Sequence, residues 1–214
     1  MKSLLRLALL LLLALSAGAQ AQHRFRDAEH WAAQFDDPAR DAWQKPDEVI
    51  RALAPASDAV IADIGSGTGY FSVRLARAVP RGRVIGVDIE PDMVRYLGQR
   101  ARRDGLENLS AQLGAADDPR LPEKADLVLL VDTYHHIAAR EDYFRRLLGS
   151  LNPGARLAVI DFRPDSPYGP PPSARVPLAQ VKRELGRAGF ETLAEHDFLP
   201  YQYFLVMRAR QRLP

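Results

Sequence analysis

The chain has 214 residues, of which 47% are hydrophobic and 26% charged, and its formal net charge is +2. This composition fits one globular domain with its own hydrophobic core. The absence of cysteine excludes a disulfide framework and a thiolate metal site. No basic stripe with interleaved aromatic residues points to nucleic acid as a partner.

The first 21 residues have the pattern of a cleavable signal peptide. Lys2 precedes an apolar stretch that runs to Leu15, and Ala19 and Ala21 form an Ala-x-Ala cleavage site. The uninterrupted apolar part is shorter than the ~20 residues that span a bilayer. We therefore expect cleavage after Ala21 and a periplasmic or secreted protein without stable membrane insertion; an uncleaved membrane anchor is the alternative. Cleavage removes Lys2 and Arg6, which lowers the net charge from +2 to 0.

Residues 22–58 are expected to form a helical segment before the main domain. Pro38 and Pro46 mark helix starts because proline suits the first turn of a helix, and 47–53 is predicted to be helical. The segment also carries Arg40 and scattered aromatic residues. We interpret these side chains either as a lid over a ligand site or as groups that pack on the sheet edge: Trp31, Phe35, Arg40 and Trp43.

From residue 59 to the end of the chain, apolar strands alternate with amphipathic helices. The expected strands are 59–63, 83–88, 110–113, 125–131 and 156–161, and the expected helices are 69–79, 91–103 and 139–150. The nearly unbroken apolar run 125–131 suits a strand covered on both faces of a parallel sheet. This alternation predicts a doubly wound, Rossmann-like α/β fold with a mostly parallel sheet and right-handed crossovers.

The last part of the domain begins with a proline-rich loop. Residues 164–177 cannot form regular structure, and together with Arg163 they are predicted to shape a ligand pocket or to form an ordinary surface excursion. A helix over 177–187 follows. Two apolar runs, 190–198 and 201–207, are then predicted to pair as an antiparallel hairpin that completes the sheet.

The most informative motif is D-I-G-S-G-T-G-Y, from Asp63 to Tyr70, which joins the first strand to the first helix. Glycines let the backbone approach a nucleotide-like ligand, because a Cβ would block that approach. Tyr70 stands where a dinucleotide fingerprint has its third glycine, and Asp63 would repel a pyrophosphate but attract an ammonium or sulfonium. Asp88 ends the second strand, where a carboxylate can accept hydrogen bonds from both hydroxyls of a ribose.

This turn and the ribose acid resemble motif I of the class I S-adenosylmethionine-dependent methyltransferases. The resemblance extends from residue 59 to about 207 and includes 113–114, 117–122, 132–136 and 151–154. The sequence resembles methyltransferases of the ubiquinone/menaquinone and arsenite-methylating types. It is also similar to exported bacterial methyltransferase-domain proteins of unassigned substrate. Asn152 departs from the pattern, since a Lys or Arg is common there, and Ala115 stands where relatives often have an acid.

The resemblance implies S-adenosylmethionine as the cofactor and assigns residues to it. Asp63 would orient the amino group, Asp88 would bind the ribose hydroxyls, and Ile89 would pack on the adenine. Asp117 or Asp118 would accept from the adenine amino group, or would cap the turn before Pro119. The implied cofactor-binding residues are Asp63, Gly65, Ser66, Gly67, Asp88, Ile89, Asp117, Asp118 and Asp132.

The segment that follows the fourth strand contains three residues that are candidates to contact the methyl acceptor: Tyr134, His135 and His136. Ligands of open α/β sheets bind outside the carboxyl ends of the strands. One histidine is expected to pack in the structure, and the other to act as a general base. No metal is expected, because adjacent residues point apart and no third ligand is near in sequence. The catalytic residue stays open, since displacement at a sulfonium methyl needs positioning above all.

These observations favour a methyltransferase that transfers a methyl group to a small organic acceptor by in-line displacement. The alternative is a non-catalytic S-adenosyl-ligand-binding protein of the cell envelope, because the methyl donor is made in the cytosol. A nicotinamide-dependent oxidoreductase is a third hypothesis, which the glycine spacing and Asp63 disfavour. The acceptor, the attacked atom and the oligomeric state are left open.

Overall fold

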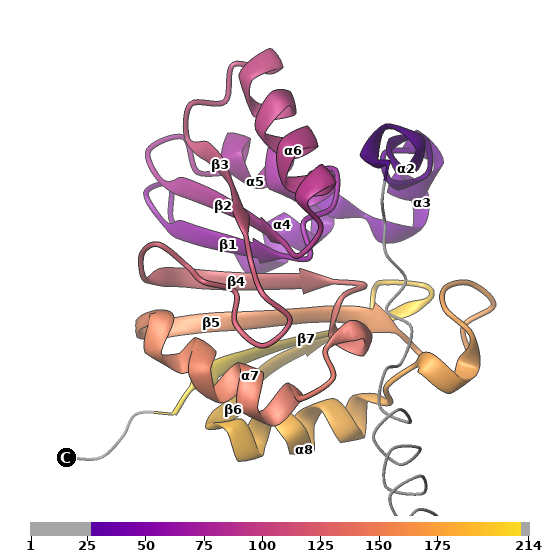
Figure 1. Cartoon of the computed structure of the whole chain (residues 1–214). Helices are drawn as coiled ribbons and strands as arrows, with labels where there is room; N and C mark the ends of the chain where they lie inside the picture. Colours follow the sequence, from indigo (N-terminus) through magenta and orange to yellow (C-terminus); the bar gives the residue numbers. More distant parts are fainter. Residues whose placement is uncertain (1–26, 211–214) are drawn as a thin grey trace, which may run out of the picture.

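The structure is a computed structural model that describes residues 27–210, so the predicted signal peptide lies outside the described residues. A seven-stranded sheet with the order β3-β2-β1-β4-β5-β7-β6 forms its centre (Figure 1). The first five strands are parallel, and β6 and β7 form the predicted antiparallel hairpin. This confirms the predicted fold class. The strands are β1 (Val60–Ile64), β2 (Arg83–Asp88), β3 (Leu109–Leu113), β4 (Ala125–Val131), β5 (Leu151–Phe162), β6 (Phe190–His196) and β7 (Gln202–Ala209).

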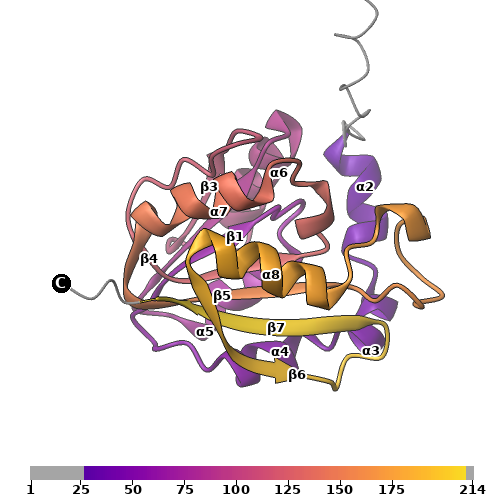
Figure 2. The ribbon, with the colours of Figure 1, turned by 90° about the horizontal axis from the view of Figure 1, so that it is seen from below.

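Helices cover both faces of the sheet. One face carries α4 (Pro46–Leu53), α5 (Tyr70–Ala78) and α6 (Pro91–Arg103), and the other carries α7 (Arg140–Leu147) and α8 (Leu178–Ala188) (Figures 1 and 2). Side chains of β4 alternate between the two cores, with Val128 on the α7 side and Leu129 on the α5 side. Both faces of this central strand are buried, which explains its unbroken apolar run.

The N-terminal segment consists of short helices: α2 (Ala28–Phe35), η1 (Pro38–Arg40), α3 (Asp41–Gln44) and then α4. Asp27 caps α2 by accepting a hydrogen bond from the backbone N–H of His30 at 3.2 Å. Pro38 and Pro46 occupy first-turn positions, as predicted. In Figure 1 α2 and α3 lie beside the carboxyl ends of the strands. The chain's own N-terminal part therefore covers the edge at which a ligand is expected.

One predicted boundary near Pro153 and Gly154 was wrong. The helix expected over 139–150 is present as α7 with a last turn that is the 3₁₀ helix η3 (Leu148–Ser150). The strand expected to begin at 156 begins at Leu151, so Pro153 and Gly154 lie inside β5. The pairing with β4 shifts there, between Ala125 and Leu127, and this irregularity absorbs the turn residues.

The remaining short elements lie in connections. The 3₁₀ helix η2 (Tyr134–His136) follows β4, and η4 (Pro172–Ala174) is a single turn within the proline-rich loop. Of the helices between residues 27 and 210, none has both the length and the apolar character needed to cross a membrane.

Candidate functional site

The glycine turn between β1 and α5 is held against β2. The backbone N–H groups of Gly65 and Ser66 donate to the carbonyl of Val87 at 2.8 and 3.0 Å, and all three glycines of the turn have positive φ. A Cβ on Gly65 would lie 2.1 Å from Oγ1 of Thr133, which follows β4. Both the backbone conformation and this close approach therefore require glycine at position 65.

Two buried hydroxyls of this turn have no hydrogen-bond partner among the described residues. They are Oγ of Ser66 and Oγ1 of Thr68. Buried polar groups are almost always hydrogen-bonded, so orphaned hydroxyls mark a place where a further polar group fits. Ser66 is one of the predicted site residues, and its hydroxyl is available to form a hydrogen bond with a ligand that approaches the turn.

Two carboxylates flank the turn at the ends of β1 and β2. Asp63 is 3% exposed and accepts a hydrogen bond from Ser72 Oγ at 2.5 Å. Burial raises the pKa of Asp63 to about 6, although the Ser72 hydrogen bond acts in the opposite direction. Asp88 accepts from the backbone N–H groups of Gly67 and Glu90, both at 2.9 Å, and burial raises its pKa as well. An ionised carboxylate has about four acceptor positions, so Asp88 keeps two for a ligand.

An apolar patch adjoins these carboxylates. Ile89 is 45% exposed and Leu113 is 42% exposed. They stand at the carboxyl ends of the paired strands β2 and β3, where Asp88 lies opposite Leu113. A carboxylate beside exposed aliphatic side chains suits a ligand with a polar sugar and a flat base. Ile89 thus lies next to Asp88, at the place where the sequence analysis expects the cofactor. Leu113, which the sequence analysis did not single out, lies beside it.

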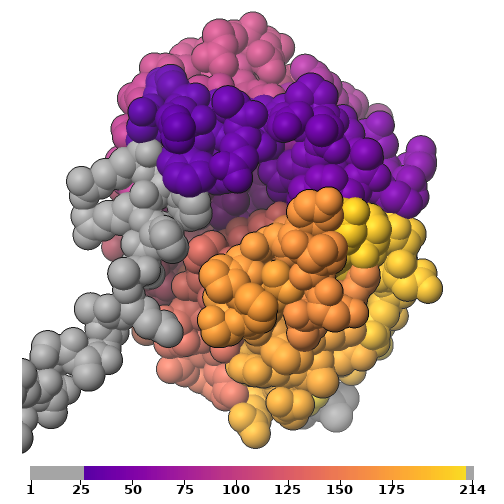
Figure 3. All heavy atoms as spheres, turned by 90° about the vertical axis from the view of Figure 1, so that its right-hand side faces the viewer, coloured from indigo at the N-terminus to yellow at the C-terminus, as the bar shows by residue number. Residues whose placement is uncertain are grey.

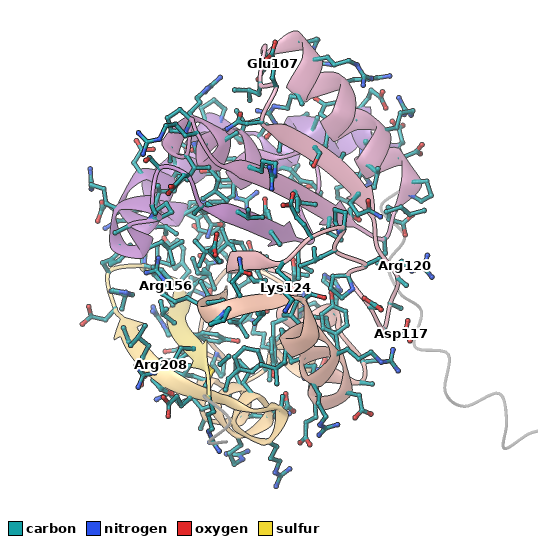
Figure 4. All side chains as sticks on the ribbon, turned by 90° about the vertical axis from the view of Figure 1, so that its left-hand side faces the viewer. Glu107, Asp117, Arg120, Lys124, Arg156 and Arg208 are labelled. Carbon is teal, nitrogen blue, oxygen red and sulfur yellow. The ribbon has the colours of Figure 1, made fainter. Side chains whose placement is uncertain are left out.

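Asp117 and Asp118 lie on the loop between β3 and β4, where Figure 4 labels Asp117 and Arg120. The Asp117 carboxylate forms an ion pair with Arg146 of α7, and this hydrogen bond lowers its pKa. Asp118 accepts from the backbone N–H of Arg120 at 2.7 Å, as the turn-capping alternative requires. Both carboxylates therefore have partners within the protein, and an adenine contact from either stays a prediction.

Asp132 follows β4 with φ +55°, a left-handed conformation that is uncommon outside glycine. Its carboxylate belongs to a closed ring of four side chains. Arg40 lies 3.4 Å from Asp132 Oδ2 and donates to Gln44 Oε1 at 3.1 Å, Gln44 donates to Gln202 Oε1 at 2.6 Å, and Gln202 donates to Asp132. Burial raises the pKa of Asp132 to about 7, against the opposing effect of Arg40.

Strain of this kind in a non-glycine residue persists where the surroundings enforce it, often at functional sites. The ring joins the N-terminal segment to the ends of β4 and β7 and leaves Gln44 and Gln202 fully buried. The sequence analysis named Asp132 and Arg40 but not these two glutamines. No local signal identifies the contact of the two glutamines with each other or that of Gln202 with Asp132, because these partners lie 70 or more residues apart in sequence.

The three predicted acceptor-side residues are separated by the turn of η2. Tyr134 is fully buried, donates to Glu184 Oε2 at 2.7 Å and stacks on Phe144 with ring centres 5.4 Å apart. The structure therefore places Tyr134 in the core beneath α7 and α8. The rings of His135 and His136 lie 4.0 Å apart, and His136 is exposed. Within residues 27–210 no three His, Asp or Glu side chains are grouped as a metal site would need.

His135 forms a pair with Asp161, which the sequence analysis missed. The imidazole Nδ1 lies 2.9 and 3.0 Å from the two carboxylate oxygens, and the backbone N–H of His135 donates to Oδ2 at 3.1 Å. Both side chains are buried, with 5% and 1% exposed. Asp161 ends the predicted strand 156–161. The carboxyl-end rule applied to Asp88 and Asp132 could therefore have found it as well.

The α2 helix lies over the glycine turn. The ring of Phe35 lies 3.5 Å from the position that a Gly67 Cβ would take, and Trp31 stacks on Phe35 with ring centres 5.4 Å apart. Arg100 of α6 pairs with Asp36 at 2.7 Å and donates to the Thr68 carbonyl. These contacts place two of the predicted lid aromatics above the turn.

On the other side of the strand ends lies the loop that follows β5. Trp43 has its ring centre 6.0 Å from that of Phe162 and 6.1 Å from that of Tyr201, and Tyr168 lies 4.6 Å from Tyr201. Arg163 donates to the carbonyl of Leu199, while Asp165 is exposed. Figure 3 views this edge, where the N-terminal segment (indigo) lies above the loop (orange). The N-terminal segment and the loop after β5 thus lie side by side at the carboxyl ends of the strands, where Trp43 and Tyr168 both contact Tyr201.

Comparison with known proteins agrees with this arrangement. A family model described as a methyltransferase domain matches residues 55–192, which is more than half of the chain. The chain is 31% identical over 116 residues to an uncharacterized methyltransferase of Mycobacterium tuberculosis, and the match covers 54% of this chain and 57% of that protein.

Two further proteins show the same likeness. Erythromycin 3''-O-methyltransferase of Saccharopolyspora erythraea is 31% identical over 118 residues, covering 52% of this chain and 39% of that protein. The matches therefore cover 57% and 39% of the length of these two curated relatives. Among solved structures, a SAM dependent methyltransferase from Aquifex aeolicus superposes with a TM-score of 0.78 at 22% identity, covering 86% of this chain and 99% of that one.

Proposed function

The chain belongs to this methyltransferase-domain family, and we propose that it transfers the methyl group of S-adenosylmethionine to a small organic acceptor. One observation carries the proposal: a glycine turn with positive φ stands between two carboxylates, Asp63 and Asp88, whose pKa values burial raises. Such a site disfavours an anionic pyrophosphate and favours a cationic ligand that bears a ribose.

The residues present fit this cofactor. The orphaned Ser66 hydroxyl and the Gly65 backbone would face its methionyl part, and Asp63 would hold the ammonium group through the charge it carries when ionised. Asp88 would accept from the ribose hydroxyls with the two acceptor positions that its backbone partners leave. Ile89 and Leu113 would pack against the base. Asp132, beside Thr133 and the glycine turn, would lie near the same ligand.

When bound, S-adenosylmethionine supplies a methyl group that its positively charged sulfur activates for attack. The protein's contribution is then mainly to align the acceptor, and orientation can contribute up to ~7–11 kcal/mol in ideal intramolecular cases. The α2 helix and the loop 163–177 would exclude water from the acceptor side.

Isothermal titration of the mature protein with S-adenosylmethionine tests the cofactor, with NADH as the matched ligand for the oxidoreductase hypothesis. Micromolar binding of the first and none of the second supports the proposal, and the reverse order refutes it. Incubation with radiolabelled donor and an extract of small molecules then tests transfer. Binding without any labelled product would favour the non-catalytic ligand-binding protein.

We also propose that the mature chain acts outside the cytoplasm. The signal-peptide pattern of residues 1–21 supports this localisation. Cell fractionation of the full-length chain with a C-terminal tag tests it: a soluble envelope fraction of reduced mass is expected. Full-length protein in the cytoplasm would contradict export, and full-length protein in the membrane fraction would support the uncleaved anchor.

A further inference from the structure

We propose that Asp161 is a positioning residue that makes His135 the general base, and that the methyl acceptor therefore reacts through a hydroxyl group. The inference rests on the proposed function. It begins from the pair that links the ends of β4 and β5, in which Nδ1 of His135 lies 2.9 Å from Asp161 Oδ2.

The contacts of Asp161 fix the orientation of the imidazole. The carboxylate accepts from the backbone N–H groups of Phe162 at 2.8 Å and of His135 at 3.1 Å, so it cannot turn without losing both bonds. An ionised carboxylate has no hydrogen to donate, and Nδ1 must therefore carry the hydrogen that joins the pair. The other ring nitrogen, Nε2, is left as the proton acceptor, and no described residue forms a hydrogen bond with it.

The pair lies on the acceptor side of the proposed cofactor site. Two residues before His135, the Thr133 side chain packs directly on the glycine turn, at 2.1 Å from the position that a Gly65 Cβ would take. On the other side, Phe162 follows Asp161 and contacts the aromatic wall through Trp43. His135 is thus between the turn that would hold the methyl donor and the loop that would hold the acceptor.

A general base is useful only when the nucleophile carries a proton that neutral water does not remove. An amine or thiol that is already a free nucleophile needs positioning alone, whereas an alcohol or phenol must lose a proton as it reacts. His135 Nε2 would accept that proton while the acceptor oxygen bonds to the methyl carbon and the electron pair of the broken carbon–sulfur bond stays on sulfur. Asp161 would then stabilise the imidazolium and return it to the same tautomer.

The first test needs no acceptor, and its main readout comes from the wild-type protein. Nitrogen-15 NMR of histidine-labelled protein at pH 8 reports which ring nitrogen carries hydrogen, and the His135→Gln variant assigns the resonance. The Nδ1–H tautomer is expected in the wild type and a mixture in Asp161→Asn. An Nε2–H tautomer in the wild type, or no change in Asp161→Asn, would overturn the positioning role.

The second test concerns the acceptor class. Formation of S-adenosylhomocysteine is measured with a panel of small phenols and alcohols, each matched by the amine of the same skeleton. Turnover of hydroxyl compounds is expected, with kcat 10²–10⁴-fold lower in Asp161→Asn and little change in KM for the donor. Asp142→Asn, which alters an exposed carboxylate on α7, should leave both constants unchanged.

Turnover of the amines alone, or of no hydroxyl compound, would overturn the hydroxyl assignment. Equal losses in the two aspartate variants would do the same for the role of Asp161. Failure of the proposed function is distinguishable from these outcomes, because it would appear as the absence of S-adenosylmethionine binding in calorimetry while the tautomer measurement stays interpretable.

Discussion

Asp88 gives the sharpest prediction about the cofactor site, because its carboxylate serves the fold and the proposed ligand at once. Its two oxygens accept from the backbone of Gly67 and Glu90 at 2.9 Å. In Asp88→Ala these two amides lose their acceptor, and the ribose loses a charged partner. The loss of stability and the loss of affinity must therefore be measured separately.

The expected magnitudes follow from the contacts. A hydrogen bond to a charged group contributes about 1.5–3 kcal/mol, so losing two ribose hydroxyl contacts should cost about 3 kcal/mol or more. That corresponds to an affinity at least ~100-fold weaker for S-adenosylhomocysteine. The amides of Gly67 and Glu90 are in half-buried residues that water can reach, so unfolding should be easier by only about 1–2 kcal/mol.

A double-mutant cycle separates the two roles. The affinities of wild type and Asp88→Ala are measured by calorimetry for S-adenosylhomocysteine and for its 2′-deoxy analogue. If Asp88 contacts the ribose, the variant should lose less affinity for the analogue, and the coupling should be about 1.5–3 kcal/mol. Glu107→Ala, which changes an exposed acid on the loop before β3, is the matched control. Equal losses for both ligands would show that Asp88 acts only through the turn, and the ribose assignment would fall.

Three further predictions test the rest of the site. Gly65→Ala should destabilise the fold by about 2–4 kcal/mol in urea titration, because its Cβ meets Thr133 at 2.1 Å with φ +75°, whereas Gly149→Ala, where no atom lies within 4 Å, should be nearly neutral. Burial raises the pKa of Asp132 to about 7, so the folded state keeps a proton that the unfolded state loses near pH 4. The free energy of unfolding should therefore fall by up to about 4 kcal/mol as pH rises from about 4 to 7. Asp132→Asn should flatten this pH dependence. Phe35→Ala should speed release of S-adenosylmethionine about tenfold in stopped-flow measurements if α2 covers the turn, and an unchanged rate would contradict that role.

The elements that the sequence predicted best are those with strong local signals. The bounds of β2, α6 and β4 agree with the predicted ranges 83–88, 91–103 and 125–131. β2 and α6 have a charged residue or a proline at an end, and β4 is a nearly unbroken apolar run between the charged residues Lys124 and Asp132. The start of β5 was wrong because Pro153 and Gly154 usually end an element, and only the pairing with β4 shows that the strand continues past them.

The residues of the candidate site likewise fall into those with a local signal in the sequence and those without one. Asp63 and Asp88 belong to local motifs, so their place beside the glycine turn was predictable from spacing. The pairing of His135 with Asp161 depends on β4 and β5 being neighbours, and on the side to which each strand end turns. A lid that contains Arg40 was one of two interpretations of the N-terminal segment, but nothing in the sequence indicates that Arg40 pairs with Asp132.

The cost of burying carboxylates accounts both for the ligand preference of the site and for the way in which the N-terminal segment closes it. A buried carboxylate is costly to ionise, and Asp63, Asp88 and Asp132 all have raised pKa values in one part of the molecule. Only Asp132 has an ion-pair partner among the described residues, and that partner, Arg40, comes from the segment that covers the strand ends. A cationic ligand would offset the remaining charge, whereas a pyrophosphate would add to it. The carboxylates, more than the glycines that many nucleotide-binding turns share, therefore distinguish a sulfonium site from a dinucleotide site.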